Sequence, residues 1–139
     1  MKKHNLEVDQ NLIKEGLYYL DAGYSSMEEL ILSREDHPFT AVIVFTYRMS
    51  CSAIHAIKDY GLSYPEDFSF IGFDMEDRDR LFSPSITSVL QPGKLIGKLM
   101  VHRLLQSIDN VELSSEEEDS VSFVNPVIKL GQSTAAVKK

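Results

Sequence analysis

Two short polar segments, residues 45–48 and 74–77, each follow an apolar run and could hold a ligand or an ion. Hard cations such as Mg²⁺ prefer clustered carboxylate oxygens, so Asp74, Glu76 and Asp77 could form the site of a magnesium-dependent enzyme or a phosphoacceptor. The cluster lacks a second acidic pair and a lysine at another strand end. We therefore keep this site as an alternative function and expect no catalysis.

Other catalytic and metal-binding patterns are absent from the sequence. The four histidines, at positions 4, 37, 55 and 102, have no spacing that places two on one helical face or pairs one with Cys51, as a zinc site requires. No nucleophile elbow, Walker loop or dinucleotide-binding glycine fingerprint is present. Cys51 lies on an apolar helical face and is predicted to be a core residue rather than a nucleophile. The sequence thus predicts a protein that binds no metal or cofactor and is not an enzyme.

Three aromatic side chains, Tyr18, Phe45 and Tyr47, lie in or beside the ends of predicted strands. Aromatic rings at such places stack on planar or sugar rings, and a tyrosine adds a hydroxyl group. Core packing is the competing interpretation. It is favoured for Phe45, which lies within its strand, and the choice stays open for Tyr47, which lies beyond it.

Composition limits what the chain can do. Of 139 residues, 43% are hydrophobic and 25% are charged, and no apolar run approaches the roughly 20 residues that span a bilayer. The formal net charge of −7 repels phosphate backbones, so any DNA contact is expected to come from another domain. One cysteine forms no internal disulfide, and the polar N-terminal residues do not resemble a signal peptide. We expect a soluble, cytoplasmic protein without membrane contact.

The elements that would position the polar segments alternate between strands and helices. Short apolar runs in residues 10–20 indicate a strand, and overlapping capping boxes at Ser25 and Ser26 predict a helix that starts near Ser26 and ends before Pro38. Residues 40–46 are apolar and rich in β-branched side chains, which is typical of a strand covered on both faces. The polar segment 45–48 would then lie at the end of this strand.

A parallel crossover unit is predicted next. Apolar side chains recur at helical spacing over residues 49–60, Gly61 is a natural C-terminal cap, and residues 68–73 form a second buried strand. A strand, a helix and a second strand in this order indicate parallel pairing. The segment 74–77 would follow the second strand at the same edge of the sheet.

The C-terminal half continues the alternation. Strands are predicted at 86–89 and 127–130, and a long helix carries apolar residues from 95 to 108 and stops at Asp109-Asn110. The acidic run 114–120 is predicted to be a mobile loop. The whole pattern predicts an α/β fold with a mainly parallel sheet flanked by helices, in which ligands bind at the carboxyl ends of the strands.

Three stretches resemble the lactose/galactose repressor family of bacterial transcription regulators. They are residues 39–44, residues 53–74, which end in Phe-Ser-Phe-Ile-Gly-Phe-Asp, and residues 84–92, which read Pro-Ser-Ile-Thr-Ser-Val-Leu-Gln-Pro. The resemblance runs from about residue 7 to residue 134. Its most specific part is residues 61–74, which run from Gly61 through Pro-Glu-Asp at 65–67 to Gly-Phe-Asp at 72–74. It implies a partial periplasmic-binding-protein-like (type I) domain.

The resemblance also implies a domain organisation. Members of the family join an N-terminal helix-turn-helix, which reads operator DNA, to a two-lobed domain that holds a small effector and forms a dimer. Residues 1–139 would be part of that effector-binding domain, with the DNA-binding domain and most of one lobe absent. The chain would begin after the first strand and helix of the C-terminal lobe, and residues 84–110 would cross into the other lobe.

Four residues of this chain lie at positions that correspond to the family's effector site, and two of them differ from the usual residue. Tyr18 lies where relatives have an effector-stacking aromatic, and Asp74 is the polar end of the Gly-Phe-Asp strand at the cleft. Tyr47 stands where relatives usually have an aspartate that binds effector hydroxyls, and Thr46 where they often have asparagine. A phenol cannot accept two hydroxyl donors as a carboxylate does, so the effector class stays open. Gly131 also replaces an arginine that is common near the C-terminus.

The resulting hypothesis is the effector-sensing and dimerisation part of a sugar-repressor-type transcription regulator. A sugar-like or related small molecule would modulate the DNA binding of the complete protein, and uncovered apolar surface would form a homodimer. One alternative is a periplasmic-type sugar-binding protein for uptake, which shares the fold. The other is the phosphoacceptor or magnesium-dependent enzyme built around Asp74. The effector-binding residues are predicted to be Tyr18, Thr46, Tyr47 and Asp74.

Overall fold

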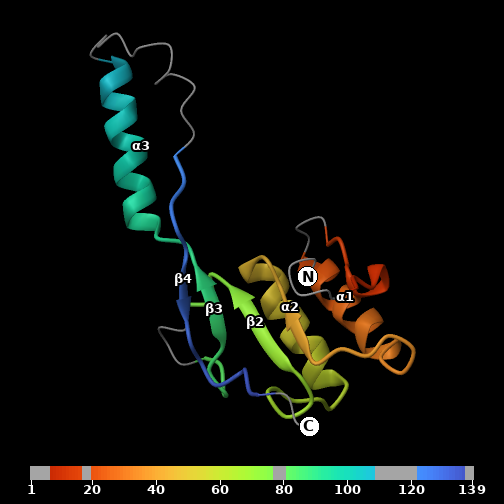
Figure 1. Ribbon diagram of the computed structural model, residues 1–139. Helices are drawn as coiled ribbons and strands as arrows, with labels where there is room; N and C mark the ends of the chain where they lie inside the picture. The colour runs from red at the N-terminus through yellow and green to blue at the C-terminus, as the bar shows by residue number, and fades with distance from the viewer. Residues whose placement is uncertain (1–6, 17–19, 77–80, 109–121, 137–139) are drawn as a thin grey trace. The chain divides into compact units, whose positions relative to one another are not determined.

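The computed structural model describes residues 7–16, 20–76, 81–108 and 122–136. They belong to two compact units, residues 1–89 with 128–139 and residues 90–127. Figure 1 shows the elements in chain order. These are a short 3₁₀ turn η2 (Gln10–Leu12), α1 (Leu20–Leu32), β1 (Ala41–Ile43), α2 (Tyr47–Asp59), β2 (Ser69–Phe73), β3 (Thr87–Leu90), α3 (Gly93–Ile108) and β4 (Val127–Lys129).

The four strands form one sheet in the order β1-β2-β3-β4. β1 pairs in parallel with β2, with Ile43 beside Ile71, and β2 pairs in parallel with β3, with Ile71 beside Thr87. The chain after β4 runs antiparallel to β3, because Ser85 O accepts from the backbone of Gln132 and Ser133 while Thr87 Oγ1 accepts from Gly131 N. The predicted α/β fold with a mainly parallel sheet is confirmed.

Helix α2 has both ends defined by its sequence. Thr46 is the N-cap, and its side chain accepts a hydrogen bond from Met49 N. At the other end, Gly61 has a φ of 68°, and the backbone N–H groups of Gly61 and Leu62 donate to Lys58 O and Ile57 O. Only glycine adopts this left-handed conformation without a steric cost, so the predicted cap is confirmed.

One buried core joins α1, α2 and the sheet. Its largest fully buried side chains come from α1, α2, β2 and the turn after β2. Met27 and Leu30 of α1, the buried side chains of α2 and Phe70 of β2 belong to this one cluster. The core members are Met27, Leu30, Val42, Ala53, Ile54, Ala56, Ile57, Tyr64, Phe68, Phe70, Met75 and Ile86.

A buried serine near the C-terminus joins β2 to β3. Ser133 is fully buried, and its hydroxyl donates to Phe70 O at 2.6 Å and accepts from Thr87 N at 2.8 Å. Its backbone adds two bonds, from Phe70 N to Ser133 O and from Ser133 N to Ser85 O. The C-terminal segment thereby holds the starts of two parallel strands together.

Two predictions for the N-terminal part are wrong. The described residues 10–16 form η2 and an extended stretch without strand pairing, because Asp9 caps the turn by accepting from Asn11 N. Helix α1 starts at Leu20, so the serines of the proposed capping boxes lie inside the helix. A Ser-x-x-Glu spacing places both side chains on one helix face as well as at a cap, which explains the error.

Among the described residues of this unit, β1 is covered on one face only. In β1, Val42 is buried while Ala41 and Ile43 are exposed, and Phe45 just beyond the strand is 72% exposed. Figure 1 shows α1 and α2 next to each other, with α2 beside β2. The prediction that residues 40–46 are covered on both faces is therefore wrong, and so is the core placement of Phe45.

Helix α3 belongs to the second unit, and none of its side chains is buried. Its exposed apolar residues are Leu95, Leu99, Met100, Val101, Leu104, Leu105 and Ile108. The predicted stop at 109–110 and the acidic segment 114–120 lie outside the described residues. None of the described helices combines the length and apolarity that a bilayer span requires.

Candidate functional site

Thr46 lies at the point where β1 gives way to α2. Its carbonyl accepts a hydrogen bond of 2.7 Å from the buried Ser50 hydroxyl, and its own hydroxyl oxygen accepts from Met49 N at 3.2 Å. Both bonds fix the first turn of α2. The Thr46 hydroxyl proton is still able to donate to a ligand, because capping uses only the oxygen's acceptor capacity.

Tyr47 is the first residue of α2 and is about half exposed. Its hydroxyl meets the Cys51 side chain one turn later, and this hydrogen bond raises the pKa of the Tyr47 phenol. The phenol therefore stays neutral at physiological pH, where it can donate one hydrogen bond and accept others. The exposed ring of Phe45 lies two residues earlier, so this end of β1 offers aromatic surface and hydroxyl groups.

Asp74 follows β2 in a left-handed backbone conformation, with a φ of 53°. Aspartate tolerates this conformation better than most residues. The turn is anchored to β3, because Asp74 N donates to Val89 O at 2.8 Å and Met75 N donates to the Ser88 hydroxyl at 2.9 Å. The Ser88 hydroxyl in turn donates to Gly72 O. A buried serine of β3 thus sets the position of Asp74.

Three of the four predicted site residues lie at the same end of the sheet, just beyond the carboxyl ends of β1 and β2. β1 and β2 run in parallel with Ile43 beside Ile71, so Thr46 and Asp74 both lie three residues beyond a paired position. Tyr47 follows Thr46 directly, whereas Tyr18 lies outside the described residues. Sequence reasoning missed the supporting serines, Ser50 and Ser88. The only feature of the sequence that points to these serines is that each is a polar residue within an otherwise apolar stretch.

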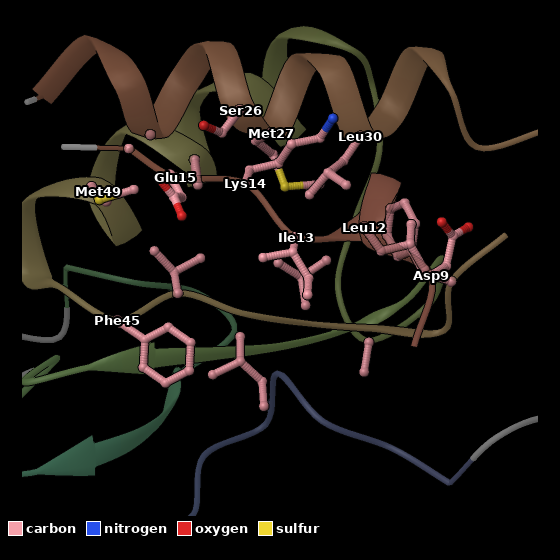
Figure 2. Close-up of a pocket in the computed structure, with 18 of the residues that line it drawn as sticks. Asp9, Leu12, Ile13, Lys14, Glu15, Ser26, Met27, Leu30, Phe45 and Met49 are labelled. Atoms are coloured by element: carbon pink, nitrogen blue, oxygen red, sulfur yellow. The ribbon is translucent and has the colours of Figure 1, made fainter. Parts of the chain in front are cut away.

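A cavity of about 800 Å³ runs along β1 and is shown in Figure 2. One wall is the consecutive residues 41–45, another is the N-terminal segment 7–16, and α1 and α2 close the side. Of the predicted site residues that the structure describes, only Thr46 lines this cavity. The cavity therefore follows the outer edge of β1, whereas the predicted effector residues lie at the strand ends.

The N-terminal wall of the cavity is tied down by charged side chains. Asp9 accepts from Asn11 N at 2.9 Å and contacts His37 Nδ1 at 2.7 Å, and Lys14 forms an ion pair with Glu29 of α1. The backbone hydrogen bond from Asn11, followed by the contact with His37, lowers the pKa of Asp9.

The part of the chain that the structure describes holds no metal site at Asp74. Among the described residues, no three histidine, cysteine, aspartate or glutamate side chains lie close enough to share an ion. Asp77, which the magnesium hypothesis needs, lies outside the described residues.

Gly131 has no room for a side chain. A Cβ atom there would lie 2.5 Å from the carbonyl carbon of Ile86 and 2.5 Å from Ser85 O. Real Cβ atoms do not approach backbone this closely, so the glycine allows β4 to lie against the start of β3. The arginine common in relatives would require a different local backbone.

The fold and the strand-end site define a class of protein, an α/β ligand-binding domain that collects polar groups at the carboxyl ends of parallel strands. A family model described as a periplasmic binding protein-like domain matches residues 1–134. The chain belongs to this family, in the form found in regulators of the lactose repressor type, as the sequence resemblance predicted.

Curated relatives support the assignment. The chain is 35% identical over 126 residues to the HTH-type transcriptional repressor PurR of Serratia proteamaculans, which covers 91% of this chain and 35% of the relative. It is 37% identical over 112 residues to catabolite control protein A of Priestia megaterium, with 81% and 33% covered. The chain thus spans about a third of the length of these relatives.

Solved structures share the fold. The transcription regulator CcpA of Lactococcus lactis superposes with a TM-score of 0.79 at 24% identity, over 96% of this chain and 46% of that one. A complex titled transcriptional regulator CelR-cellobiose superposes with a TM-score of 0.75 at 24% identity, over 95% and 38%. At this identity the likeness concerns the fold alone.

Proposed function

We propose that this chain is the effector-sensing and dimerisation part of a sugar-repressor-type transcription regulator. The observation that carries the proposal is the placement of Thr46, Tyr47 and Asp74 at one edge of a sheet that belongs to this family. Operator DNA would be bound through a helix-turn-helix part, as the names of the relatives indicate for those proteins. The protein would act in the cytoplasm as a homodimer and without catalysis.

The side chains at the site suggest the chemistry of the effector. Phe45 and Tyr47 offer exposed rings, Thr46 and Tyr47 offer hydroxyl donors, and Asp74 offers a carboxylate one strand away. Such a set suits a small molecule with one planar or sugar ring and a few hydroxyl groups. The tyrosine at position 47 should make binding of hydroxyl-rich sugars weaker than a carboxylate would.

Amide chemical shifts of the isotope-labelled chain would test the binding site. We would titrate it separately with ribose, cellobiose and adenine, and expect saturable shifts at Thr46, Tyr47 and Asp74 for at least one of them. Saturable shifts confined to another part of the chain would contradict the site, and no shift with any of the three would contradict the proposed effector chemistry.

A substitution pair sharpens this test. Tyr47→Asp should raise the affinity for the hydroxyl-rich ligand about 10-fold or more, because a hydrogen bond to a charged group contributes roughly 1.5–3 kcal/mol. Arg48→Gln is the matched control, because it changes the net charge by the same −1 at the next residue of α2 without adding a carboxylate. Equal gains in the two variants would show that net charge, rather than the position, determines binding.

A chimaera would test the regulatory role. Residues 7–134 would replace the corresponding part of catabolite control protein A of Priestia megaterium, and a reporter under its operator would be measured with and without the effector identified above. We expect effector-dependent repression that Asp74→Ala makes insensitive to the effector. A chimaera that accumulates normally and binds operator DNA, yet never responds to the effector, would contradict the proposed role.

A further inference from the structure

A second cavity, of about 380 Å³, lies at the β3–β4 side of the sheet, where residues of the segments 82–86 and 129–132 line it together with Met75. Figure 1 shows β4 beside β3 in this part of the molecule. Its volume lies within the range of roughly 300–1,000 Å³ that small-molecule sites occupy. It shares no lining residue with the strand-end site of Thr46, Tyr47 and Asp74. The cavity is therefore a separate candidate for a binding site.

Hydrogen bonds hold the two walls of this cavity together. Ser85 O accepts from Gln132 N at 2.7 Å and from Ser133 N at 3.0 Å. Gly131 lies so close to the other wall that a Cβ atom would be 2.5 Å from both Ser85 O and the carbonyl carbon of Ile86. The shape of the cavity is thus set before a ligand arrives, and binding does not have to order these segments first.

One part of the lining is apolar and belongs to the core. Met75 is 1% exposed, Ile86 is 3% exposed, and the partly buried Phe82 packs against the same core cluster. A ring or a branched hydrocarbon group placed against these side chains would remove apolar surface from water. This part of the lining therefore provides a place for the apolar portion of a ligand.

The other part of the lining is polar. Among the described residues, none of its four polar side chains has a hydrogen-bond or ion-pair partner; they are Ser83, Ser85, Lys129 and Gln132. Lys129 is the one charged residue among the described residues that line the cavity. Its ammonium group, the two hydroxyl groups and the Gln132 amide can all donate hydrogen bonds. A lining that combines several donors with one positive charge favours an anion.

We propose that this cavity binds a small organic carboxylate that carries an apolar ring or a branched hydrocarbon group. The carboxylate accepts from Lys129 and the serine hydroxyls, while the apolar group lies against Met75, Phe82 and Ile86. An ionised acceptor is favoured over a neutral one, because hydrogen bonds that involve charged groups are roughly twice as strong as those between neutral groups. The site is independent of the effector site, so either can fail without the other.

Nuclear magnetic resonance of the full 139-residue chain, titrated with benzoate at constant ionic strength, would test the site. We expect saturable shifts of the amides of Ser85, Ile86, Leu130 and Gly131, with a dissociation constant on the order of 1 mM for so small a ligand. Benzyl alcohol keeps the ring and lacks the charge, so it should bind about 5-fold or more weakly. Acetate keeps the charge and lacks the ring, so it should give no saturable shift of these amides.

Two lysine variants separate the cavity from the overall charge. Lys129→Gln removes the proposed partner of the carboxylate at an exposed position, so the chain should fold and bind benzoate about 3-fold or more weakly. Lys58→Gln removes the same charge from the exposed last turn of α2, outside the cavity, and should leave the affinity unchanged.

Four results would overturn the proposal. The first is no saturable shift with benzoate up to about 20 mM. The second is equal binding of benzyl alcohol, which would indicate an apolar crevice, or of acetate, which would indicate an adventitious ion only. The third is equal affinity of the two lysine variants, which would assign any effect to net charge. The fourth is shifts confined to Thr46, Tyr47 and Asp74, which would place benzoate in the effector site instead.

Discussion

Buried serines determine much of the local geometry at the residue scale. Ser50 fixes the start of α2 at Thr46, Ser88 fixes the turn at Asp74, and Ser133 links β2 to β3. The strand-end positions of Thr46, Tyr47 and Asp74 could be predicted because they follow apolar runs. The serines could not, since a lone hydroxyl in an apolar stretch does not reveal which backbone group it will bind.

Ser133→Ala should lower the free energy of unfolding by about 1–3 kcal/mol, because Phe70 O and Thr87 N lose their hydroxyl partner while buried. Urea denaturation would measure the change. Ser63→Ala is the control, since the Ser63 hydroxyl contacts Asp67 at the surface and its loss should cost less than about 0.5 kcal/mol. Equal effects in the two variants would refute the proposed role of Ser133.

The N-terminal segment should loosen in acid. The pKa of Asp9 is lowered below 3.8 in the folded chain, so its stabilising contribution is present above pH 3.8 and is lost as the pH falls through the lower folded pKa. The difference in thermal midpoint between the native chain and Asp9→Ala should therefore be largest above about pH 5 and shrink as the pH falls below 3.8. A difference that persists unchanged at pH 2 would exclude this linkage.

At the scale of secondary-structure elements, the close packing of α1 against α2 organises the fold. A Cβ atom at Gly23 of α1 would lie 2.3 Å from Ser52 Oγ and 2.6 Å from Met49 O of α2, so the glycine sets how closely the two helices approach. Reciprocal tyrosine–carboxylate bonds, from Tyr24 to Asp59 and from Tyr60 to Glu28, join the same helices. The close contact makes α1 and α2 one layer on the sheet.

Two helical glycines give a matched pair of substitutions. Gly23→Ala should destabilise the chain by about 1–3 kcal/mol, because the helices must separate. A Cβ atom at Gly97 in α3 would meet no other atom within 4 Å. Gly97→Ala should therefore favour helix formation in α3 by roughly 0.5–1 kcal/mol through helix propensity alone. Urea denaturation measures the first effect and far-ultraviolet circular dichroism the second. A stabilising Gly23→Ala would contradict the close approach.

Most elements could be predicted from the sequence, and the errors have a common physical origin. Helix α2 carries its own periodicity and caps, and strands β2 and β3 and helix α3 each carry a recognisable apolar pattern. The start of α1 and the exposure of Phe45 depend on which other elements cover them. A window of neighbouring residues contains no information about a covering element that comes from elsewhere in the chain.

At the scale of the whole molecule, the uncovered apolar residues of α3 lead us to expect association. Light scattering after size-exclusion chromatography should give twice the 15.7 kDa of one chain. Met100→Lys with Leu104→Lys should shift the mass toward one chain, because two charges would lie in the contact, while Leu32→Lys in α1 should not. A concentration-independent mass of one chain for the native sequence would refute dimerisation.

The Ser133 link also bears on how the protein is synthesised. Phe70 and its hydroxyl partner are 63 residues apart, so at about 5–20 residues per second the ribosome needs roughly 3–13 s to add the second after the first. During that interval the starts of β2 and β3 lack the group that joins them, and their edges are open to other chains. A nascent chain of this protein should therefore expose these edges to chaperones until Ser133 emerges, and slower translation of residues 90–133 would lengthen that exposure.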